Sequence, residues 1–428
     1  MHSKIIEVSI IGVGARGGEA YGRYINESKD RFRIVSLCDT NPVRLKKYGD
    51  LFQVEESNRF LDEETFWEKK RSELLLICTM DQLHVRMAKR ALSLGYNILL
   101  EKPISDDPEE LQELYEAYKA SGKTMMVCHV LRYTTMIKKI KEILDSGVIG
   151  KLITIDQTEN VAYWHDAHSY VRGNWRRKED CTSMIMAKCC HDLDLLQYFA
   201  KSRCKSLSSM GDLRYFKKEN APEGSAERCT RCPFIDACPY SAKRIYLDTW
   251  EAKGRPADIW PQHAITNADP LTYEALYEAI EKGDYGRCVY RCDNDVVDNE
   301  TTIMTFENGV TATLKMEAFT SRGGRDIRLL GSLGEIDLHE DEGDGYIELR
   351  MFGGKVEHYD LKDMAYDNGG HGGGDYAMLD KLYLCLSEGI QDTDTSLEKS
   401  LESHYMAIAA EKSRLNDGKL IELKDYRD

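Results

Sequence analysis

The stretch Val8–Gly17, VSIIGVGARG, decides the fold. Its apolar run leads into the pattern Gly12-x-Gly14-x-x-Gly17, and a helical stretch follows from Glu19. A strand, a glycine turn and a helix in this order are typical of a dinucleotide-binding unit. The glycines allow the tight turn, the approach of the backbone to a pyrophosphate and the close packing of helix on strand, and the helix N-terminus offers free N–H groups to the phosphates. We predict that the dinucleotide contacts Gly12, Gly14, Ala15, Arg16 and Gly17.

The second apolar run, Ile34–Cys38, ends in Asp39. An acidic residue at this position accepts hydrogen bonds from the adenosine ribose, which favours NAD over NADP. Asn41, Arg44 and Arg16 are close to it in sequence and could hold the 2′-phosphate of NADP. The sequence therefore predicts NAD and leaves NADP open.

Apolar runs and stretches with helical spacing alternate through the first 130 residues. The runs Leu74–Cys78, Asn97–Leu100 and Met125–Cys128 are separated by such stretches. Strands that alternate with helices imply right-handed crossovers and a parallel sheet. We therefore predict an α/β fold in which residues 1–130 form a Rossmann dinucleotide-binding domain.

The pattern changes after residue 130. Residues 152–159 and several runs between 301 and 351 alternate apolar and polar side chains, which is typical of antiparallel strands. Helices are expected at 137–146, at 187–200, from about 375 and at 397–415. Residues 205–285 are irregular and hold all six Pro of this half and three of its ten Cys. We predict that residues 131–428 form an α+β domain, mainly antiparallel, with an irregular Cys-containing insertion at about 205–285.

Composition and charge exclude several classes of protein. The 428 residues carry 58 Lys and Arg against 73 Asp and Glu, a net charge of −15, whereas nucleic-acid binding and anionic-membrane binding rest on basic surfaces. No apolar stretch approaches the roughly 18 to 20 residues that span a bilayer, and no small-residue cleavage site follows the N-terminal apolar run. We expect no nucleic-acid or membrane partner, and a cytoplasmic protein.

Cysteine is frequent, with 13 residues, but the number is odd and the chain is long. A secreted disulfide framework is therefore not expected. Cys229-x2-Cys232-x5-Cys238 is a candidate structural zinc site that needs a fourth ligand, for which Cys204, Cys288 and Cys292 are candidates. Free or packed thiols and a disulfide remain the alternatives.

Several motifs together resemble the Gfo/Idh/MocA family of glucose-fructose oxidoreductase and inositol dehydrogenase relatives. Glu101-Lys102-Pro103 follows the run NILL, and Ile77-Cys78-Thr79 with His84 precedes it. The segment SGVIGKL (146–152), a helix carrying His191 and Asp194, and GGGDY (372–376) extend the resemblance over most of the chain.

The resemblance implies a two-domain oxidoreductase whose second domain presents an open antiparallel sheet. It implies hydride transfer from a sugar or polyol carbon to a tightly held nicotinamide. It places Thr79, His84, Glu101 and Lys102 at the cofactor, Lys102 at the reacting hydroxyl, and His191 as the acid/base residue. It also implies a cis peptide bond before Pro103.

One position departs from the family pattern. Many dehydrogenases of the family carry Asp four residues before the histidine, where this chain has Ala187. Lys188, His191 and Asp194 follow at intervals of three and are expected on one helix face. His191 then serves as the base that takes the hydroxyl proton, Asp194 fixes its tautomer, and Lys102 or Lys188 stabilises the developing alkoxide.

A polar and aromatic cluster begins at Tyr163 and follows the strand expected at 152–159. Aromatic rings stack on the C–H faces of sugars and Arg binds hydroxyls or carboxylates, so the cluster predicts a carbohydrate subsite; a polar loop at an oligomer interface is the alternative. Asp375 is explained as a helix N-cap. The predicted substrate-binding residues are His129, Arg132, Trp164, His165, His168, Arg172, Trp175, Arg176, Asp194 and His371.

The sequence supports three functions. The first is an NAD(P)-dependent dehydrogenase that oxidises a secondary hydroxyl of a sugar, glycoside or inositol. The second is an NAD-dependent glycosidase or lyase that oxidises C3 transiently, with no net redox change. The third is a regulatory protein that binds NAD without turnover. In each case a homo-oligomer, dimer or tetramer, is expected through the open sheet.

Overall fold

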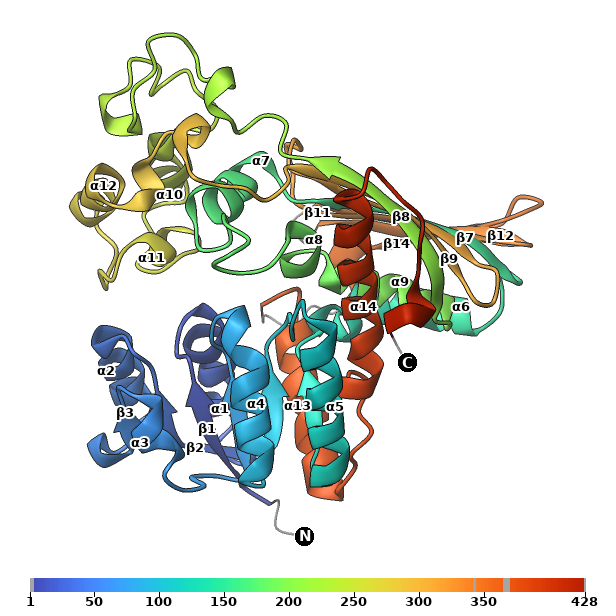
Figure 1. Cartoon of the computed structure of the whole chain (residues 1–428), viewed down its shortest axis with the longest axis horizontal. Helices are drawn as coiled ribbons and strands as arrows, with labels where there is room; N and C mark the ends of the chain where they lie inside the picture. Colours follow the sequence, from blue (N-terminus) through green and yellow to red (C-terminus); the bar gives the residue numbers. More distant parts are fainter. Residues whose placement is uncertain (1–3, 342–343, 365–369, 427–428) are drawn as a thin grey trace.

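The computed structural model describes residues 4–341, 344–364 and 370–426, which form two lobes (Figure 1). The first lobe holds a parallel sheet of order β3-β2-β1-β4-β5-β6. Its strands are β1 (Ile6–Ile11), β2 (Phe32–Cys38), β3 (Arg59–Phe60), β4 (Leu74–Ile77), β5 (Asn97–Leu100) and β6 (Met125–Val127). Chain order reverses between β1 and β4, and ligands of such sheets bind at the carboxyl ends of the strands at this point.

Burial explains these strands and the helices beside them. All four residues of β4 are fully buried, as expected for a parallel strand covered on both faces. The helices are α1 (Arg23–Glu27), α2 (Pro42–Leu51), α3 (Glu63–Trp67), α4 (His84–Ser93) and α5 (Pro108–Ser121), preceded by a π-helical segment, η1 (Ala15–Gly22). The predicted Rossmann architecture is confirmed. The sequence did not predict the short strand β3.

The second lobe is built on a nine-stranded sheet of order β14-β13-β12-β11-β7-β10-β9-β8-β15. The strands are β7 (Leu152–Asn160), β8 (Cys204–Asp212), β9 (Asn299–Phe306), β10 (Thr311–Glu317), β11 (Gly324–Gly331), β12 (Gly334–Asp341), β13 (Asp344–Met351), β14 (Val356–Asp360) and β15 (Ile421–Glu422). The mainly antiparallel sheet is confirmed. The strands between residues 301 and 351 do not all pair with their neighbours in sequence, because β7 lies between β10 and β11 and pairs in parallel with β10.

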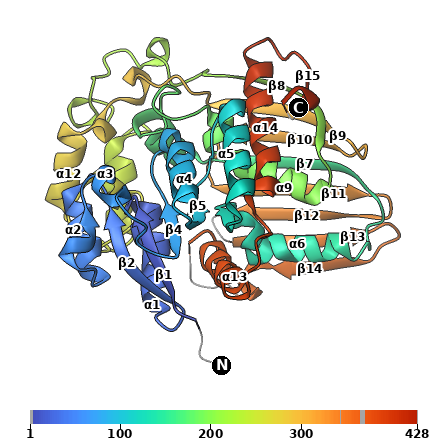
Figure 2. The ribbon, with the colours of Figure 1, turned by 60° about the horizontal axis from the view of Figure 1, so that its bottom comes forward.

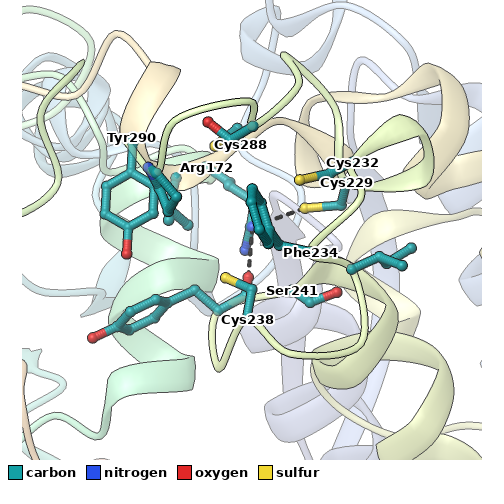
Figure 3. Close-up of a pocket in the computed structure, with 13 residues that line it drawn as sticks. Arg172, Cys229, Cys232, Phe234, Cys238, Ser241, Cys288 and Tyr290 are labelled. Carbon is teal, nitrogen blue, oxygen red and sulfur yellow. Dashed lines mark hydrogen bonds between the residues drawn. The ribbon is translucent and has the colours of Figure 1, made fainter. Parts of the chain in front are cut away.

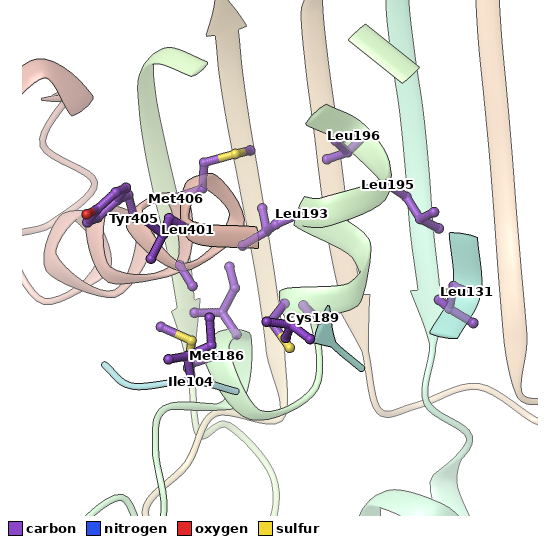
Figure 4. Close-up of a cluster of buried hydrophobic side chains, with 14 of the residues drawn as sticks. Ile104, Leu131, Met186, Cys189, Leu193, Leu195, Leu196, Leu401, Tyr405 and Met406 are labelled. Atoms are coloured by element: carbon purple, nitrogen blue, oxygen red, sulfur yellow. The ribbon is translucent and has the colours of Figure 1, made fainter. Parts of the chain in front are cut away.

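Helices cover one face of this sheet, as Figure 2 shows. They include α6 (Thr135–Asp145), α8 (Met184–Ala187), α9 (Cys190–Ala200) and α14 (Leu397–Arg414). Side chains of α8, α9 and α14, among them Met186, Leu193 and Met406, share one core with Ile104 and Leu131 from the segments after β5 and β6 (Figure 4). The two lobes are therefore joined by a continuous hydrophobic core.

The helix α13 (Gly374–Glu388) lies far along the chain but packs on the first lobe. Its side chains Met378, Leu379 and Leu382 belong to the core that contains Val8 and Phe32. Hydrogen bonds to Asp380 from Tyr24 and Arg31 reinforce the contact.

The irregular segment begins later than predicted. Residues 204–212 form β8, and the chain leaves the sheet only between β8 and β9, over residues 213–298. This insertion contains α10 (Thr249–Ala252), α11 (Gln262–Ile265) and α12 (Tyr273–Lys282), and it packs around its own core with α7 (Tyr163–Asp166) and the turn η5 (Ala167–Arg172). Within the described residues, no helix has the length and apolar character that a membrane span requires.

Candidate active site

The glycine loop lies between β1 and η1 at the carboxyl edge of the parallel sheet. Gly12 has φ +84°, and a Cβ there would lie 2.3 Å from the carbonyl oxygen of Cys78. At Gly17 it would lie 2.0 Å from the carbonyl oxygen of Gly12. At Gly14, by contrast, only Arg44 Nη1 comes within 4 Å, at 3.8 Å. Internal packing therefore requires Gly12 and Gly17, and leaves the backbone at Gly14 open to a ligand.

Asp39 follows β2 and braces this loop. Its Oδ2 accepts a hydrogen bond from the N–H of Val13 at 2.8 Å, and its Oδ1 accepts one from the N–H of Asn41 at 2.8 Å. A carboxylate offers about four acceptor positions, so each oxygen keeps a lone pair for a ribose hydroxyl. Asn41 caps α2 through its side chain.

Arg16 has partners that the sequence did not predict. Its Nε lies 2.8 Å from Glu101 and its Nη2 2.6 Å from Asp375, and it also bonds to the hydroxyl of Tyr21. Burial by itself raises the pKa of Glu101, but the charge and hydrogen bonds of Arg16 outweigh it and lower that pKa below its ordinary value. Arg16 therefore ties η1, β5 and α13 together, and the idea that it holds a 2′-phosphate is not supported. Arg44 is exposed and keeps that possibility.

Three predicted cofactor residues form a bonded layer under the loop. His84 is fully buried, with Nδ1 2.6 Å from the carbonyl oxygen of Pro103 and Nε2 3.1 Å from that of Thr79. Glu101 accepts hydrogen bonds from Arg16 and from the N–H of Lys102. These contacts assign His84 and Glu101 a supporting role behind the cofactor position, while Thr79 is half-buried.

Lys102 crosses from the first lobe to the second. It follows β5, precedes a cis bond to Pro103, and its Nζ donates to the carbonyl oxygen of Ala187 at 2.8 Å. Ala187 is the position at which the family pattern described above has Asp, and here its backbone carbonyl binds the ammonium group. The predicted cis peptide bond is present.

His191 lies in the first turn of α9, with its side chain 7% exposed. No described residue hydrogen-bonds to either ring nitrogen, and Nδ1 is buried. Burial lowers the pKa of His191 well below its ordinary value, and the charge of Lys102 lowers it further. Near neutral pH the ring is therefore uncharged, as a proton acceptor must be.

Lys188 does not share a helix face with His191, which corrects the prediction. The helix α8 ends at Ala187 and α9 begins at Cys190, so Lys188 lies in the break between them. Its Nζ is 3.0 Å from Glu159 on β7. The break turns Lys188 toward the sheet.

A buried ionic network that the sequence analysis missed lies beneath Lys188. Arg325 on β11 contacts Glu159 at 2.7 Å and Asp192 at 2.8 Å, and Gln157 donates to Asp192 at 2.6 Å. Burial raises the pKa of Asp192, and the charge of Arg325 opposes that rise. Alternation along β7 and β11 places Gln157, Glu159 and Arg325 on the covered face, and buried polar residues in a strand pattern were the signal that could have revealed them.

Asp194 does not orient His191, contrary to the prediction. Both of its oxygens bind Arg132, at 2.7 and 2.6 Å, and the pair is buried. Arg132 also donates to the carbonyl oxygen of Asp394. We assign Arg132 and Asp194 to the scaffold that joins the turn after β6 to α9.

His129 lies behind His191, with ring centres 5.8 Å apart. It is fully buried, neither ring nitrogen is hydrogen-bonded to a described residue, and Nδ1 lies 3.9 Å from Asp194. Burial lowers the pKa of His129 to about 4, although the charge of Asp194 opposes that change. On its other side, His404 of α14 accepts a hydrogen bond from the N–H of Ile104 through Nε2 at 2.8 Å. The sequence analysis did not single out His404.

His371 lies beside this group, with its ring centre 6.3 Å from that of His191. Its Nδ1 is 3.3 Å from Asp375 and 3.4 Å from Arg16. The side chain is exposed, so His371 remains a candidate substrate contact.

The cluster that begins at Tyr163 divides into two groups. Trp164 and His165 are half-buried, stack on each other, and both contact Trp260 of the insertion. Burial lowers the pKa of His165 well below its ordinary value, and the charges of Lys188 and Lys102 lower it further. Trp164 and His165 thus adjoin the group around His191.

The other members of that cluster lie inside the protein. His168 bonds to the hydroxyl of Tyr246 at 2.8 Å and is 3% exposed. Arg172 is 1% exposed and donates to the carbonyl oxygens of Arg287 and Tyr240. Arg176 pairs with Asp293, and Trp175 packs on the main core. His168, Arg172 and Arg176 therefore support the insertion and Trp175 the main core, so the structure does not place these four residues at a substrate.

The cysteine cluster lines a cavity in the insertion (Figure 3). Four cysteines surround this cavity together with Arg172: Cys229, Cys232, Cys238 and Cys288. None of the four forms a disulfide. No group of three or more His, Cys, Asp or Glu side chains within residues 4–341, 344–364 and 370–426 is arranged to hold a metal ion. The predicted zinc site is therefore not supported.

The glycine loop on a Rossmann sheet, facing Lys102 and His191 at the junction with a mixed sheet, defines an NAD-binding oxidoreductase. Residues 6–129 match the oxidoreductase family, NAD-binding Rossmann fold, and residues 141–421 match the oxidoreductase family, C-terminal alpha/beta domain. The chain belongs to the Gfo/Idh/MocA family.

Known proteins resemble the chain over different lengths. Oxidoreductase YteT of Bacillus subtilis is 22% identical over 386 residues, 85% of this chain and 86% of the relative. Inositol 2-dehydrogenase of Salmonella typhimurium is 25% identical over 151 residues, 35% of this chain and 44% of the relative. The structure of levoglucosan dehydrogenase in complex with NADH and L-sorbose is similar at a TM-score of 0.70 and 14% identity, covering 98% of this chain and 99% of the other. That structural likeness shows a shared fold.

Proposed function

We propose that the protein is an NAD(P)-dependent dehydrogenase that oxidises a secondary hydroxyl of a sugar, glycoside or inositol. The observation that carries this proposal is the position of Lys102 and His191. The Nζ of Lys102 is hydrogen-bonded to the carbonyl oxygen of Ala187, four residues before the buried His191, at the edge of the sheet where a Rossmann cofactor ends. Burial and the charge of Lys102 lower the pKa of His191, which keeps its ring uncharged near neutral pH. Dehydrogenases of inositol and levoglucosan among the similar proteins support the substrate class.

The residues present fit a dinucleotide. The open backbone at Gly14 and the start of η1 accommodate a pyrophosphate, and Asp39 retains acceptor positions for a ribose. The bound nicotinamide supplies the hydride acceptor. We assign Gly12, Gly14, Ala15, Gly17, Asp39 and Thr79 to cofactor binding, with NAD as the expected cofactor and Arg44 as the residue that would admit NADP.

The chain's own side chains then move the proton. A hydride leaves a carbinol carbon only as its hydroxyl proton is taken, so a base must reach that oxygen. His191 is uncharged and takes the proton, while Lys102 and Lys188 place positive charge beside the oxygen as it becomes negative. Trp164, His165, His129 and His371 surround this position and are the remaining candidates for holding the substrate.

The glycosidase or lyase function is not favoured by the comparisons. It predicts product masses without net NADH, so one experiment separates it from the dehydrogenase. Purified protein is incubated with NAD⁺ or NADP⁺ and a panel of sugars, glycosides and inositols while 340 nm absorbance and product masses are recorded. A substrate-dependent rise at 340 nm with a product lighter by two hydrogens is expected. Cleaved products without that rise would overturn the proposal.

The predicted homo-oligomer and cytoplasmic location stay predictions. The thirteen cysteines form no disulfide, which suits a reducing compartment. Within the described residues, the nine-stranded sheet carries helices on one side only and leaves its other face open to a second copy (Figure 1). Light scattering of the purified protein would give the oligomeric state, and a monomer at micromolar concentration would refute the prediction.

A further inference from the structure

Trp260 is the aromatic residue of the insertion that lies against the proposed site. It precedes α11, and its side chain is 36% exposed although three rings surround it. The ring centres of His165, Trp164 and His168 lie 4.9, 5.3 and 5.4 Å from that of Trp260. A large aromatic ring that contacts three other rings and is still partly exposed retains apolar surface for a ligand.

The segment that carries Trp260 is attached to the first lobe by ion pairs. Asp258 lies 3.7 Å from Arg23, and Asp269 lies 3.0 Å from Lys47 on α2. These contacts lie on the side of the parallel sheet that carries the glycine loop. The insertion therefore reaches across from the second lobe and holds Trp260 in a defined position.

His165 connects Trp260 with the reacting groups. His165 follows β7 closely along the chain, and Glu159 of β7 lies 3.0 Å from the Nζ of Lys188. Lys102 is hydrogen-bonded at Ala187, next to Lys188. The positive charges of both lysines act on the His165 ring, and no described residue hydrogen-bonds to its nitrogens. The site therefore runs from Lys102 and Lys188 through His165 to Trp260, whose ring centre is 4.9 Å from that of His165.

We infer that Trp260 determines specificity by stacking on a second ring, so that the substrate is a glycoside or disaccharide rather than a single sugar or inositol. This inference rests on the proposed function. The apolar C–H face of a sugar, or an aromatic aglycone, matches the exposed apolar surface of the Trp260 indole, and His165 offers ring nitrogens for a hydroxyl near the linkage. Because the insertion supplies Trp260, the segment between β8 and β9 sets the substrate class.

The test compares single-ring and two-ring ligands on four proteins. Wild type, W260A, W260F and the control Y273A are titrated calorimetrically, in the presence of NADH, with D-glucose, D-galactose, myo-inositol, their available methyl and phenyl glycosides, cellobiose and lactose. Tyr273 is an exposed residue of the same insertion that stacks on Tyr277. The kcat and KM values of compounds that are oxidised are measured in parallel.

We expect at least one two-ring compound to bind about tenfold more tightly than its single-ring counterpart. W260A should remove that difference, W260F should restore most of it, and Y273A should leave it unchanged. For an oxidised two-ring compound, W260A should raise KM about tenfold with kcat within twofold.

Two results would overturn the inference. One is that no two-ring compound gains affinity over its counterpart, or that W260A weakens both kinds equally. The other is a loss of NADH affinity in W260A, which would make the indole a cofactor contact. A retained Trp260-dependent preference with no nicotinamide reduction would instead refute the proposed function and leave the second-ring subsite in place.

Discussion

Arg16 and Arg44 both lie at the glycine loop, and replacing each by Met separates a structural cation from a cofactor-binding one. The side chains of Glu101 and Asp375, which pair with Arg16, are 8% and 0% exposed. R16M therefore leaves two buried carboxylates without their cation. Breaking a buried pair by removing one partner costs about 3 to 5 kcal/mol. Since 1 kcal/mol shifts the Tm of a unit of 150 to 250 residues by about 2 to 4 °C, we expect Tm to fall by about 10 °C.

Arg44 is expected to behave in the opposite way. It is exposed, has no ion pair among the described residues, and lies beside the open backbone of Gly14. R44M should keep the wild-type Tm and lose affinity for the cofactor, more for NADPH than for NADH if Arg44 binds a 2′-phosphate. Scanning calorimetry gives Tm, and titration calorimetry gives Kd for both cofactors.

The Tm and the NADPH affinity of R16M together distinguish a structural role of Arg16 from a cofactor-binding one. An unchanged Tm in R16M would show that the contacts with Glu101 and Asp375 contribute little to stability. A selective loss of NADPH affinity in R16M at wild-type Tm would return Arg16 to the role that the sequence first suggested.

Three further predictions concern the site. H191N should lower kcat by about 10² to 10⁴-fold with cofactor affinity intact. Wild-type kcat/KM should stay level as pH falls from 8 to 6.5, because burial and Lys102 keep the pKa of His191 below its ordinary value. A fall in kcat/KM at or above pH 6.5 would contradict this. K188M should raise KM and change kcat by no more than a few-fold, since Lys188 pairs with Glu159 outside the helix of His191. If Lys188 instead takes the role of the Asp that the family pattern has at position 187, steady-state kinetics would show a large fall in kcat. The pKa of His129 is about 4 in the folded protein against an ordinary 6.5. The unfolded chain therefore binds the extra proton, and the free energy of unfolding falls as pH drops below 6.5, by about 2 kcal/mol at pH 5. The loss of Tm between pH 7 and pH 5 should be smaller in H129M than in wild type, and equal losses would show that the pKa of His129 is not lowered in the folded protein.

The first lobe could be predicted from the sequence because its signals are local. The glycine spacing, the apolar run before it and Asp39 after the next strand all act within a few residues of the chain. The EKP motif, through the family resemblance, also gave the cis bond before Pro103, while the role of Lys102 stays a prediction. Strand order in the second lobe was not accessible in this way, since β7 pairs with strands more than 150 residues later.

The site was harder to predict because its partners are distant in sequence. Asp194 was expected to serve His191 three residues away, but the bidentate contact comes from Arg132, 62 residues earlier. Lys188 was placed on a helix that in fact breaks before it, at a position that no proline or glycine marks. Trp260 carries no motif at all, and only the folded insertion brings it to His165.

The position of α13 has a consequence for how the chain is made. The hydrophobic core of the first lobe includes Met378, Leu379, Leu382 and Leu386, which leave the ribosome only after every strand of the second sheet except β15 has been synthesised. Domains generally fold as units, and the N-terminal one folds first during synthesis. Here the N-terminal sheet must wait with part of its apolar surface uncovered until nearly the entire polypeptide is available, so premature termination within the last strands leaves both halves incomplete.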